Sequence, residues 1–202
     1  MTQNNLHEFS YDHSKEEIAR KFGKGSVVWM VGLSGSGKST IANEILKKLS
    51  ILKERVIILD GDTFRKGLNS DLSFSIEDRS ENLRRVSHVA KLFSDQGYIV
   101  ICAFISPLSK HRRVAREVIG ESFLECYIDV SVEECEKRDP KGLYSKARAG
   151  EIPDFTGVSS PFEIPERPEL RLEMTMTADV ASQLVVDFLK DNCSDVFIDS
   201  LS

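Results

Sequence analysis

The sequence has no apolar run of the length that a membrane span needs, and its first residues, MTQNNLHEFSYDHSKEE, carry neither the basic nor the apolar stretch of a secretory signal. Its four cysteines, Cys102, Cys126, Cys135 and Cys193, form no CxxC pair and no cluster with histidine. These absences argue against a disulfide scaffold and against a cysteine zinc site. We therefore expect a cytoplasmic protein with reduced thiols and no membrane partner.

Charge is spread unevenly along the 202 residues. The chain carries 27 basic and 32 acidic residues, a net charge of −5, and so lacks the basic excess of a general nucleic-acid-binding surface. Residues 151–202 hold 11 acidic and 3 basic residues, a net of −8, which leaves +3 for residues 1–150. We expect no nucleic-acid partner, and we expect any site for an anionic ligand in the first 150 residues.

Short apolar runs alternate with amphipathic segments along the chain. Runs typical of buried strands are residues 26–31, 55–59, 98–104, 123–129 and, more weakly, 170–174. Segments with helical periodicity are residues 40–50, 76–96, 109–119, 132–138 and 180–189. Near-continuous apolar strands separated by helices indicate a parallel sheet that is covered on both faces. The pattern predicts a doubly wound, three-layer α/β domain.

One stretch breaks this alternation. Residues 139–171 contain five of the six prolines and three glycines, and residues 138–157 carry the four cations Arg138, Lys141, Lys146 and Arg148. A loop-rich insertion of this length is typical of a lid or a binding loop, and we expect bound nucleotides to order it. The predicted organisation is an N-terminal arm and helix over 1–24, one domain over 25–190 with a lid at about 138–157, and an acidic tail over 191–202.

The strongest single signal is the run from Gly32 to Ser39, GLSGSGKS, which matches the phosphate-binding pattern GxxxxGK[ST] in full. It follows an apolar strand and precedes a helical segment, as this loop requires. Its glycines let backbone N–H groups point at a phosphate, and the helix adds its positive dipole end. Lys38 is then expected at the β- and γ-phosphates and Ser39 at Mg²⁺. The motif predicts a P-loop NTPase-type domain whose nucleotide-binding residues are Gly32, Leu33, Ser34, Gly35, Ser36, Gly37, Lys38, Ser39 and Thr40.

This loop occurs in GTPases, ATPases and small-molecule kinases alike, so other features must decide between them. The sequence has no [NT]KxD guanine-reading motif after the loop, and it is too short for the further domains of a motor or transporter ATPase. A single small domain with a lid-like insertion favours a metabolite kinase.

Polar residues follow the predicted second strand, in the run LDGDTFR. Because ligands bind beyond the carboxyl ends of strands in a doubly wound sheet, Asp62 is expected to face the phosphate loop. A carboxylate there can accept a hydroxyl proton or hold Mg²⁺ through water, and Arg65 can hold phosphate or sulfate oxygens of an acceptor. FISP, after the third strand, places the Ser106 hydroxyl at the same edge. An Asp-Gly turn with a helix cap at Asp62 explains the first run without any ligand.

The next segment, FSIEDRSENLRR, starts a helix for which Ser75 is the expected N-cap and Asp78 its capping-box partner. Arg79 and Asn82 stand three residues apart and so share one helical face. Together with Phe74, these side chains suit a planar base that carries an acidic substituent.

Seven runs of the sequence, taken in order over residues 25 to 170, resemble the motifs of the adenylyl-sulfate kinase (APS kinase) family. They are GLSGSGKST, DGDxxRxGL, FSxxDRxENxRR, FISP, RDPKGLY, KARAGEI and FTG. The resemblance implies transfer of the γ-phosphate of ATP to the 3′-hydroxyl of adenosine 5′-phosphosulfate, which yields 3′-phosphoadenylyl sulfate in sulfate activation. It also implies Mg²⁺ dependence and a homodimer. Because the sequence has no room for a sulfurylase domain, we expect a separate ATP sulfurylase to supply the acceptor.

The resemblance also implies roles for individual residues. It makes Lys38, Asp62 and Ser106 catalytic, with Ser106 described in the family as a phosphoserine intermediate. Residues implied to bind the acceptor are Asp62, Arg65, Phe74, Arg79, Asn82, Ile105, Ser106, Lys141 and Phe155. Beyond the loop, the ATP side is implied to include Arg138, Arg148 and Thr177, and the metal residues are Ser39 and Asp62. We favour direct in-line transfer over a phosphoserine, because such transfer needs only positioning and charge stabilisation.

Two other functions stay open at this point. One is a related small-metabolite kinase whose acceptor is a sugar or a nucleoside monophosphate. The other is a nucleotide-binding partner of a sulfurylase with no activity of its own. The paired arginines and Phe74 favour a sulfated or phosphorylated nucleotide as acceptor, and the presence of Lys38, Ser39 and Asp62 together favours an active enzyme.

Overall fold

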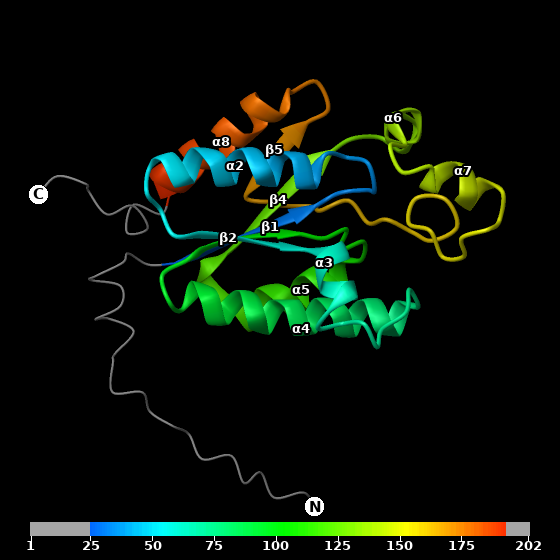
Figure 1. Ribbon diagram of the computed structural model, residues 1–202, viewed down its shortest axis with the longest axis horizontal. Helices are drawn as coiled ribbons and strands as arrows, with labels where there is room; N and C mark the ends of the chain where they lie inside the picture. Colours follow the sequence, from blue (N-terminus) through cyan, green and yellow to red (C-terminus); the bar gives the residue numbers. More distant parts are fainter. Residues whose placement is uncertain (1–24, 193–202) are drawn as a thin grey trace, which may run out of the picture.

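In the computed structural model, which describes residues 25–192, a central sheet of parallel strands lies between two layers of helices (Figure 1). The strands are β1 (Ser26–Val31), β2 (Val56–Asp60), β3 (Ile99–Ala103), β4 (Phe123–Asp129) and β5 (Leu170–Glu173), in the spatial order β2-β3-β1-β4-β5. The helices are α2 (Lys38–Ile51), α3 (Gly61–Lys66), α4 (Ile76–Ser94), α5 (Ser109–Ile119), the short 3-10 turn η1 (Gly120–Ser122), α6 (Val132–Arg138), α7 (Leu143–Arg148) and α8 (Ala178–Asn192). The predicted three-layer α/β fold is confirmed.

Strand β1 forms the centre of the sheet and pairs with β3 on one side and β4 on the other. All six of its residues are buried, because α2 and α8 cover one face of the sheet while α4 and α5 cover the other (Figure 1). Adjacent side chains of a strand point to opposite faces. Met30 accordingly packs in the core beneath α2 and α8, and Trp29 packs in the core on the α4 and α5 side.

Some predictions differ from the structure, and others concern residues that the structure does not describe. The predicted arm over residues 1–24 and nearly all of the predicted tail lie outside the described residues. Helices α3 and α7 are not among the predicted helical segments, although the alternative of a helix cap at Asp62 allowed a helix near α3, and α7 falls inside the predicted lid. The described cysteines, Cys102, Cys126 and Cys135, are buried and free. None of the helices in residues 25–192 has the length and hydropathy of a membrane span.

Candidate active site

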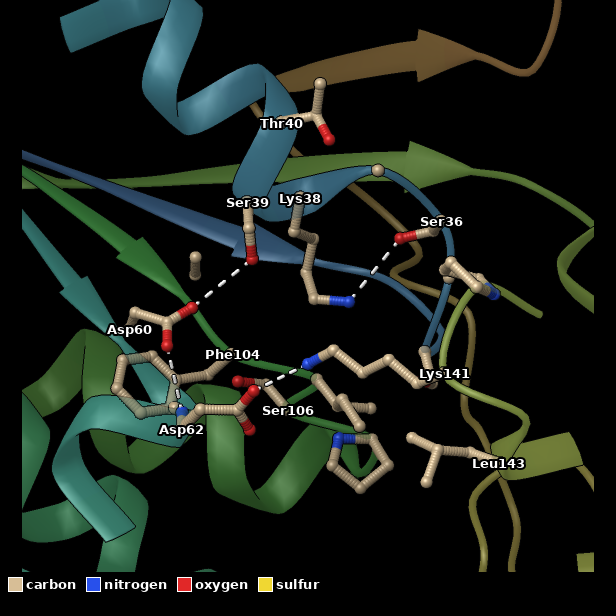
Figure 2. Close-up of a pocket in the computed structure, with 18 of the residues that line it drawn as sticks. Ser36, Lys38, Ser39, Thr40, Asp60, Asp62, Phe104, Ser106, Lys141 and Leu143 are labelled. Atoms are coloured by element: carbon tan, nitrogen blue, oxygen red, sulfur yellow. Dashed lines mark hydrogen bonds and ion pairs between the residues drawn. The ribbon is translucent and has the colours of Figure 1, made fainter. Parts of the chain in front are cut away.

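A cavity of about 580 Å³ opens at the carboxyl ends of the central strands (Figure 2). Its walls are the loop between β1 and α2, helix α3 after β2, the start of α4, the turn after β3, the segment between α6 and α7, and the turn before α8 with the first residue of that helix. Six segments that are far apart in sequence therefore meet at one end of the sheet, as expected for a doubly wound fold.

The loop between β1 and α2 forms one wall. It turns through Gly35 and Gly37, whose φ angles of 76° and 101° are readily adopted only by glycine. Helix α2 begins directly after this turn, at Lys38, so its first N–H groups lie at the cavity. Backbone donors and a helix N-terminus in one concave loop form an anion-binding site.

Lys38 lies within this loop and is 9% exposed. Its Nζ donates to the carbonyl oxygens of Gly32 and Leu33, at 2.8 and 2.6 Å, and to the hydroxyl of Ser36 at 3.4 Å. Burial lowers the pKa of Lys38 to about 8, although the Asp60 carboxylate acts in the opposite direction. An anion at this position would stabilise the charged form of Lys38.

Asp60, the last residue of β2, lies opposite Ser39. Its Oδ2 accepts from the Ser39 hydroxyl at 3.2 Å, while its Oδ1 caps α3 by accepting from the N–H groups of Asp62 and Thr63 at 3.0 and 3.3 Å. The helix cap that the ligand-free interpretation put at Asp62 therefore belongs to Asp60. The carboxylate and hydroxyl oxygens of Asp60 and Ser39 are ligands of the kind that Mg²⁺ prefers.

Asp62 points into the cavity from α3, where it meets the segment that follows α6 (Figure 2). Lys141 Nζ donates to Asp62 Oδ2 at 2.6 Å. Hydrogen bonding to Asp62 is the main reason why the pKa of Lys141 is raised. In this structure Asp62, which we expected beside the metal, is thus paired with Lys141, while Asp60 bonds to Ser39.

The opposite wall brings together an aromatic ring and two arginines. The guanidinium carbon of Arg65 lies 4.2 Å from the centre of the Phe74 ring, and that of Arg79 lies 5.6 Å from it. Phe74 is mostly exposed, so part of its ring is accessible to a ligand. Burial, and secondly the nearby Arg65, lowers the pKa of Arg79, and an anion beside the two guanidinium groups would relieve their repulsion.

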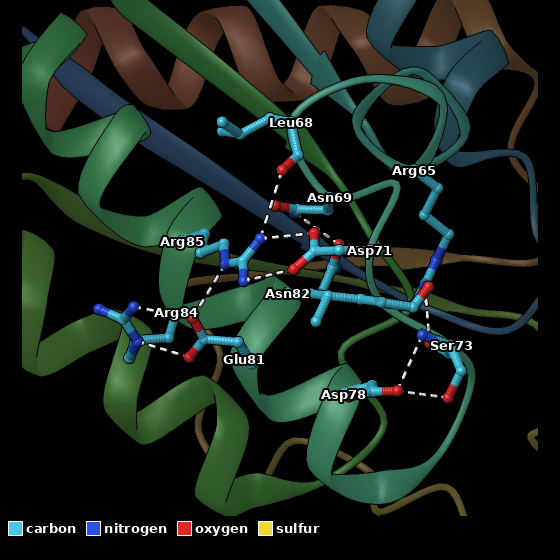
Figure 3. Close-up of polar contacts among 11 residues, drawn as sticks. Arg65, Leu68, Asn69, Asp71, Ser73, Asp78, Glu81, Asn82, Arg84 and Arg85 are labelled. Carbon is cyan, nitrogen blue, oxygen red and sulfur yellow. Dashed lines mark hydrogen bonds and ion pairs between the residues drawn. The ribbon is translucent and has the colours of Figure 1, made fainter.

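The segment between α3 and α4 is held by polar contacts that shape this wall (Figure 3). Arg85 makes two hydrogen bonds of 2.8 Å to the carboxylate of Asp71, and Asn69 donates to the side chain of the buried Asn82 at 2.8 Å. The expected N-cap at Ser75 is confirmed, since its hydroxyl accepts from the Asp78 N–H at 3.1 Å. The expected capping box does not form, because the Asp78 carboxylate accepts from the Ser73 N–H and the Ser75 N–H donates to the Ser73 hydroxyl. Asn82 lies in the cavity wall beside Arg79, as their spacing predicted.

Ser106 lines the cavity but its hydroxyl is turned into the protein. Its Oγ accepts from Trp29 Nε1 at 2.9 Å, and the residue is 1% exposed. Its carbonyl accepts from Arg112 at 3.1 Å, which helps to hold a non-glycine residue at a φ of 48°. In this arrangement Ser106 supports the turn after β3, and its buried hydroxyl is poorly placed to receive a phosphoryl group.

Most of the other expected residues also line the cavity, namely Ser34, Gly35, Ser36, Gly37, Thr40, Ile105 and Arg138. Gly32 and Leu33 contribute their carbonyl groups to Lys38 instead.

Besides Gly32 and Leu33, three further expected residues do not line the cavity. Arg148 pairs with Glu136 at 3.0 Å, and Thr177 caps the first turn of α8 by accepting from Val180 N–H at 3.3 Å. Phe155 is 8% exposed, and its ring packs edge-on against Tyr144. We expected Phe155 to cover an adenine ring, but in this structure its apolar surface is buried against the protein.

Several residues of the cavity wall were not expected from the sequence. They include Asp60, Asp139, Leu143, Tyr144, Met176 and Ala178. Asp60 could have been recognised as the last residue of a strand beside the loop, whereas nothing in the local sequence of Met176 or Ala178 indicates a ligand.

The chain resembles known proteins over most of its length. Residues 24–173 match the family model described as adenylylsulphate kinase. The adenylyl-sulfate kinase of Clostridium acetobutylicum is 53% identical over 170 residues, which are 84% of this chain and 85% of the relative. The adenylyl-sulfate kinase of Bacillus velezensis is 52% identical over 182 residues, 89% of this chain and 92% of the relative.

A solved structure resembles the fold and the sequence together. The structure of the Mycobacterium tuberculosis APS kinase CysC, in complex with AMPPNP and APS, has a TM-score of 0.81 and is 50% identical, covering 83% of this chain and 99% of that chain. The matched residues include the phosphate loop, α3, α4 and the segment after α6, which form the cavity walls. On the sequence, the fold and the site alike, the chain belongs to the adenylylsulphate kinase family, whose members are kinases.

Proposed function

We propose that the chain transfers the γ-phosphate of ATP to the 3′-hydroxyl of adenosine 5′-phosphosulfate. The observation that carries this proposal is that one cavity has a phosphate-binding loop on one side and Phe74 with two arginines on the other. The M. tuberculosis relative was solved with AMPPNP and APS in one complex, so a domain of this kind holds two nucleotides together.

ATP is assigned to the loop between β1 and α2. Lys38, now bonded to loop carbonyls, would turn its ammonium to the β- and γ-phosphates, where the N–H groups at the start of α2 also point. Ser39 and Asp60, which are hydrogen-bonded to each other, would hold Mg²⁺ directly or through water. Asp62, which we expected at the metal, is paired with Lys141 instead. When bound, Mg²⁺ supplies charge neutralisation for the phosphate oxygens.

The acceptor is assigned to the wall formed by α3 and α4. Phe74 offers its exposed face to the adenine, and Arg65 and Arg79 attract the phosphosulfate. The 3′-hydroxyl would then lie at Asp62, which accepts its proton as the oxygen attacks the γ-phosphorus. The bond from the γ-phosphorus to the bridging oxygen breaks, and ADP leaves with the electron pair. Lys38 stabilises the charge on the transferring group.

Release of ADP in the presence of different acceptors tests this proposal. We expect adenosine 5′-phosphosulfate to drive ADP release far faster than AMP or gluconate, because only the first carries both the base and the sulfated phosphate. Asp62→Asn, which keeps the shape of the side chain, should lower turnover by about a hundredfold if Asp62 is a general base. Equal rates with all three acceptors, or with none, would overturn the assignment of the acceptor.

The proposal includes two partners that the family resemblance implies. One is a second copy of the chain in a homodimer, which light scattering on the purified protein would test. The other is a separate ATP sulfurylase, whose product is the acceptor and whose addition with sulfate and ATP should replace added adenosine 5′-phosphosulfate in the assay. We place this reaction in the cytoplasm.

A further inference from the structure

Tyr144 joins the segment after α6 to the phosphate loop. It lies in the first turn of α7, is 1% exposed and forms part of the cavity wall. Its hydroxyl donates to the carbonyl oxygen of Ser34 at 3.0 Å. Ser34 stands in the middle of the phosphate loop, so a buried phenol fixes one peptide group of that loop.

The hydrogen bond from Tyr144 to the Ser34 carbonyl also fixes the direction of the Gly35 N–H. A trans peptide is planar, and its C=O and N–H point in opposite directions. When Tyr144 holds the Ser34 carbonyl, the N–H of Gly35 must point away from Tyr144. Within residues 25–192 that N–H has no hydrogen-bond partner, so it is available to a phosphate oxygen. Because Gly35 has no side chain to resist rotation, the peptide needs an external anchor.

The anchor is itself held from the acceptor side. The Tyr144 and Phe155 rings pack edge to face, with centroids 5.0 Å apart at an angle of 77°. The two residues that flank Phe155 accept hydrogen bonds from Arg79, at 2.8 Å to the Asp154 carbonyl and 3.2 Å to the Thr156 hydroxyl. A packed path therefore runs from the arginine on α4 through Phe155 and Tyr144 to the phosphate loop.

We propose that Tyr144 is a positioning residue that sets the orientation of the Ser34–Gly35 peptide, and that Phe155 and Arg79 transmit changes on the acceptor side to this peptide. The proposal rests on the proposed function only in naming a nucleotide as the ligand of the loop. It gives Phe155 a role inside the protein, through its contact with Tyr144.

Tyr144→Phe tests the first part because it removes only the hydroxyl. Tyr127→Phe is a matched control, since Tyr127 is also buried and its hydroxyl donates to Asp129 at 2.9 Å, outside the cavity. By calorimetry, Tyr144→Phe should weaken ADP binding about threefold to tenfold, which is the usual effect of one hydrogen bond. Tyr127→Phe should bind ADP like the unaltered protein.

The amide resonance of Gly35 provides a second readout that does not depend on activity. In the ligand-free protein, Tyr144→Phe should shift this resonance and Tyr127→Phe should not. Arg79→Ala should shift it as well, whereas Arg84→Ala, on the same helix but paired with Glu81, should leave it in place.

Three results would overturn the proposal in part or whole. Unchanged ADP affinity and an unchanged Gly35 resonance in Tyr144→Phe would remove the positioning role. Equal effects of Tyr127→Phe would show a general loss of packing instead. A Gly35 resonance that is insensitive to Arg79→Ala would remove the path from the acceptor side. None of these measurements contains adenosine 5′-phosphosulfate, so a wrong acceptor assignment would leave them unaffected.

Discussion

Lys141 donates to Asp62 across the mouth of the cavity, with Nζ 2.6 Å from Oδ2, and so joins the segment after α6 to the helix after β2 (Figure 2). The two side chains are 62% and 67% exposed. Exposed ion pairs contribute less than about 1 kcal/mol to stability. The fold therefore does not depend on this ion pair. Its effect is to hold the Lys141 cation beside Asp62, the carboxylate assigned to the acceptor hydroxyl.

Lys141→Ala should lower kcat/KM for the acceptor by at least about tenfold, because an anionic acceptor and the transferring phosphoryl group both lose a nearby cation. The melting temperature should stay within about 2 °C of the original, as expected for an exposed pair. Lys146→Ala is the control, since Lys146 lies in α7 outside the cavity wall. If both variants lose the same activity, the effect comes from the charge of the segment and the assignment of Lys141 fails.

Lys38→Ala should nearly abolish phosphoryl transfer while the protein stays folded. Each loss of about 1.4 kcal/mol of transition-state stabilisation costs a factor of ten in rate, and Lys38 is the cation placed to follow the transferring charge. Lys47→Ala, on the exposed face of the same helix, should retain full activity. If the folded Lys38→Ala variant turns over at the original rate, the loop does not have the proposed role in phosphoryl transfer.

The affinity for ADP should depend on pH through Lys38. In the free protein, burial lowers the pKa of Lys38 to about 8, and bound phosphates should raise it again. Binding above pH 8 must then take up a proton, so affinity falls as pH rises, by about tenfold to thirtyfold between pH 7.5 and 9.5. Calorimetry in buffers of different ionisation enthalpy measures this uptake directly. Lys38→Ala should show a flat profile, and an equally steep profile in that variant would assign the proton to another group.

Arg79→Ala should weaken binding of adenosine 5′-phosphosulfate about tenfold to a hundredfold, the usual cost of losing a buried charge-assisted contact. ADP binding should change much less, because Arg79 reaches the phosphate loop only through Phe155 and Tyr144. Arg84→Ala provides the control on the same helix. If calorimetry finds that both ligands lose affinity equally, the assignment of Arg79 to the acceptor side of the cavity is wrong.

Features that depend on local spacing could be predicted from the sequence. The alternation of buried strands with helices identified the fold, and the run from Gly32 to Ser39 identified the loop because its chemistry lies within eight consecutive residues. Arg79 and Asn82 were placed correctly because helical periodicity alone puts them on one face.

Features that depend on contacts between distant segments could not be predicted. Asp60 and Asp62 both follow an apolar run, and only the position where β2 ends and α3 begins decides which of them meets Ser39. Composition marked residues 138–157 as a lid, but it gave no sign that Phe155 would be buried against Tyr144. The mobility of residues 138–157 remains a prediction.

The destination of the γ-phosphate tests the account most directly. The protein would be mixed with ATP labelled at the γ-phosphate and with adenosine 5′-phosphosulfate, quenched over a time course, and separated into protein, nucleotides and inorganic phosphate. We predict that the label passes from ATP to a nucleotide phosphorylated at the 3′-position and is at no time bound to protein, because the Ser106 hydroxyl is buried against Trp29. Transient label on Ser106, or label that appears only as inorganic phosphate, would contradict direct transfer between two nucleotides in this cavity.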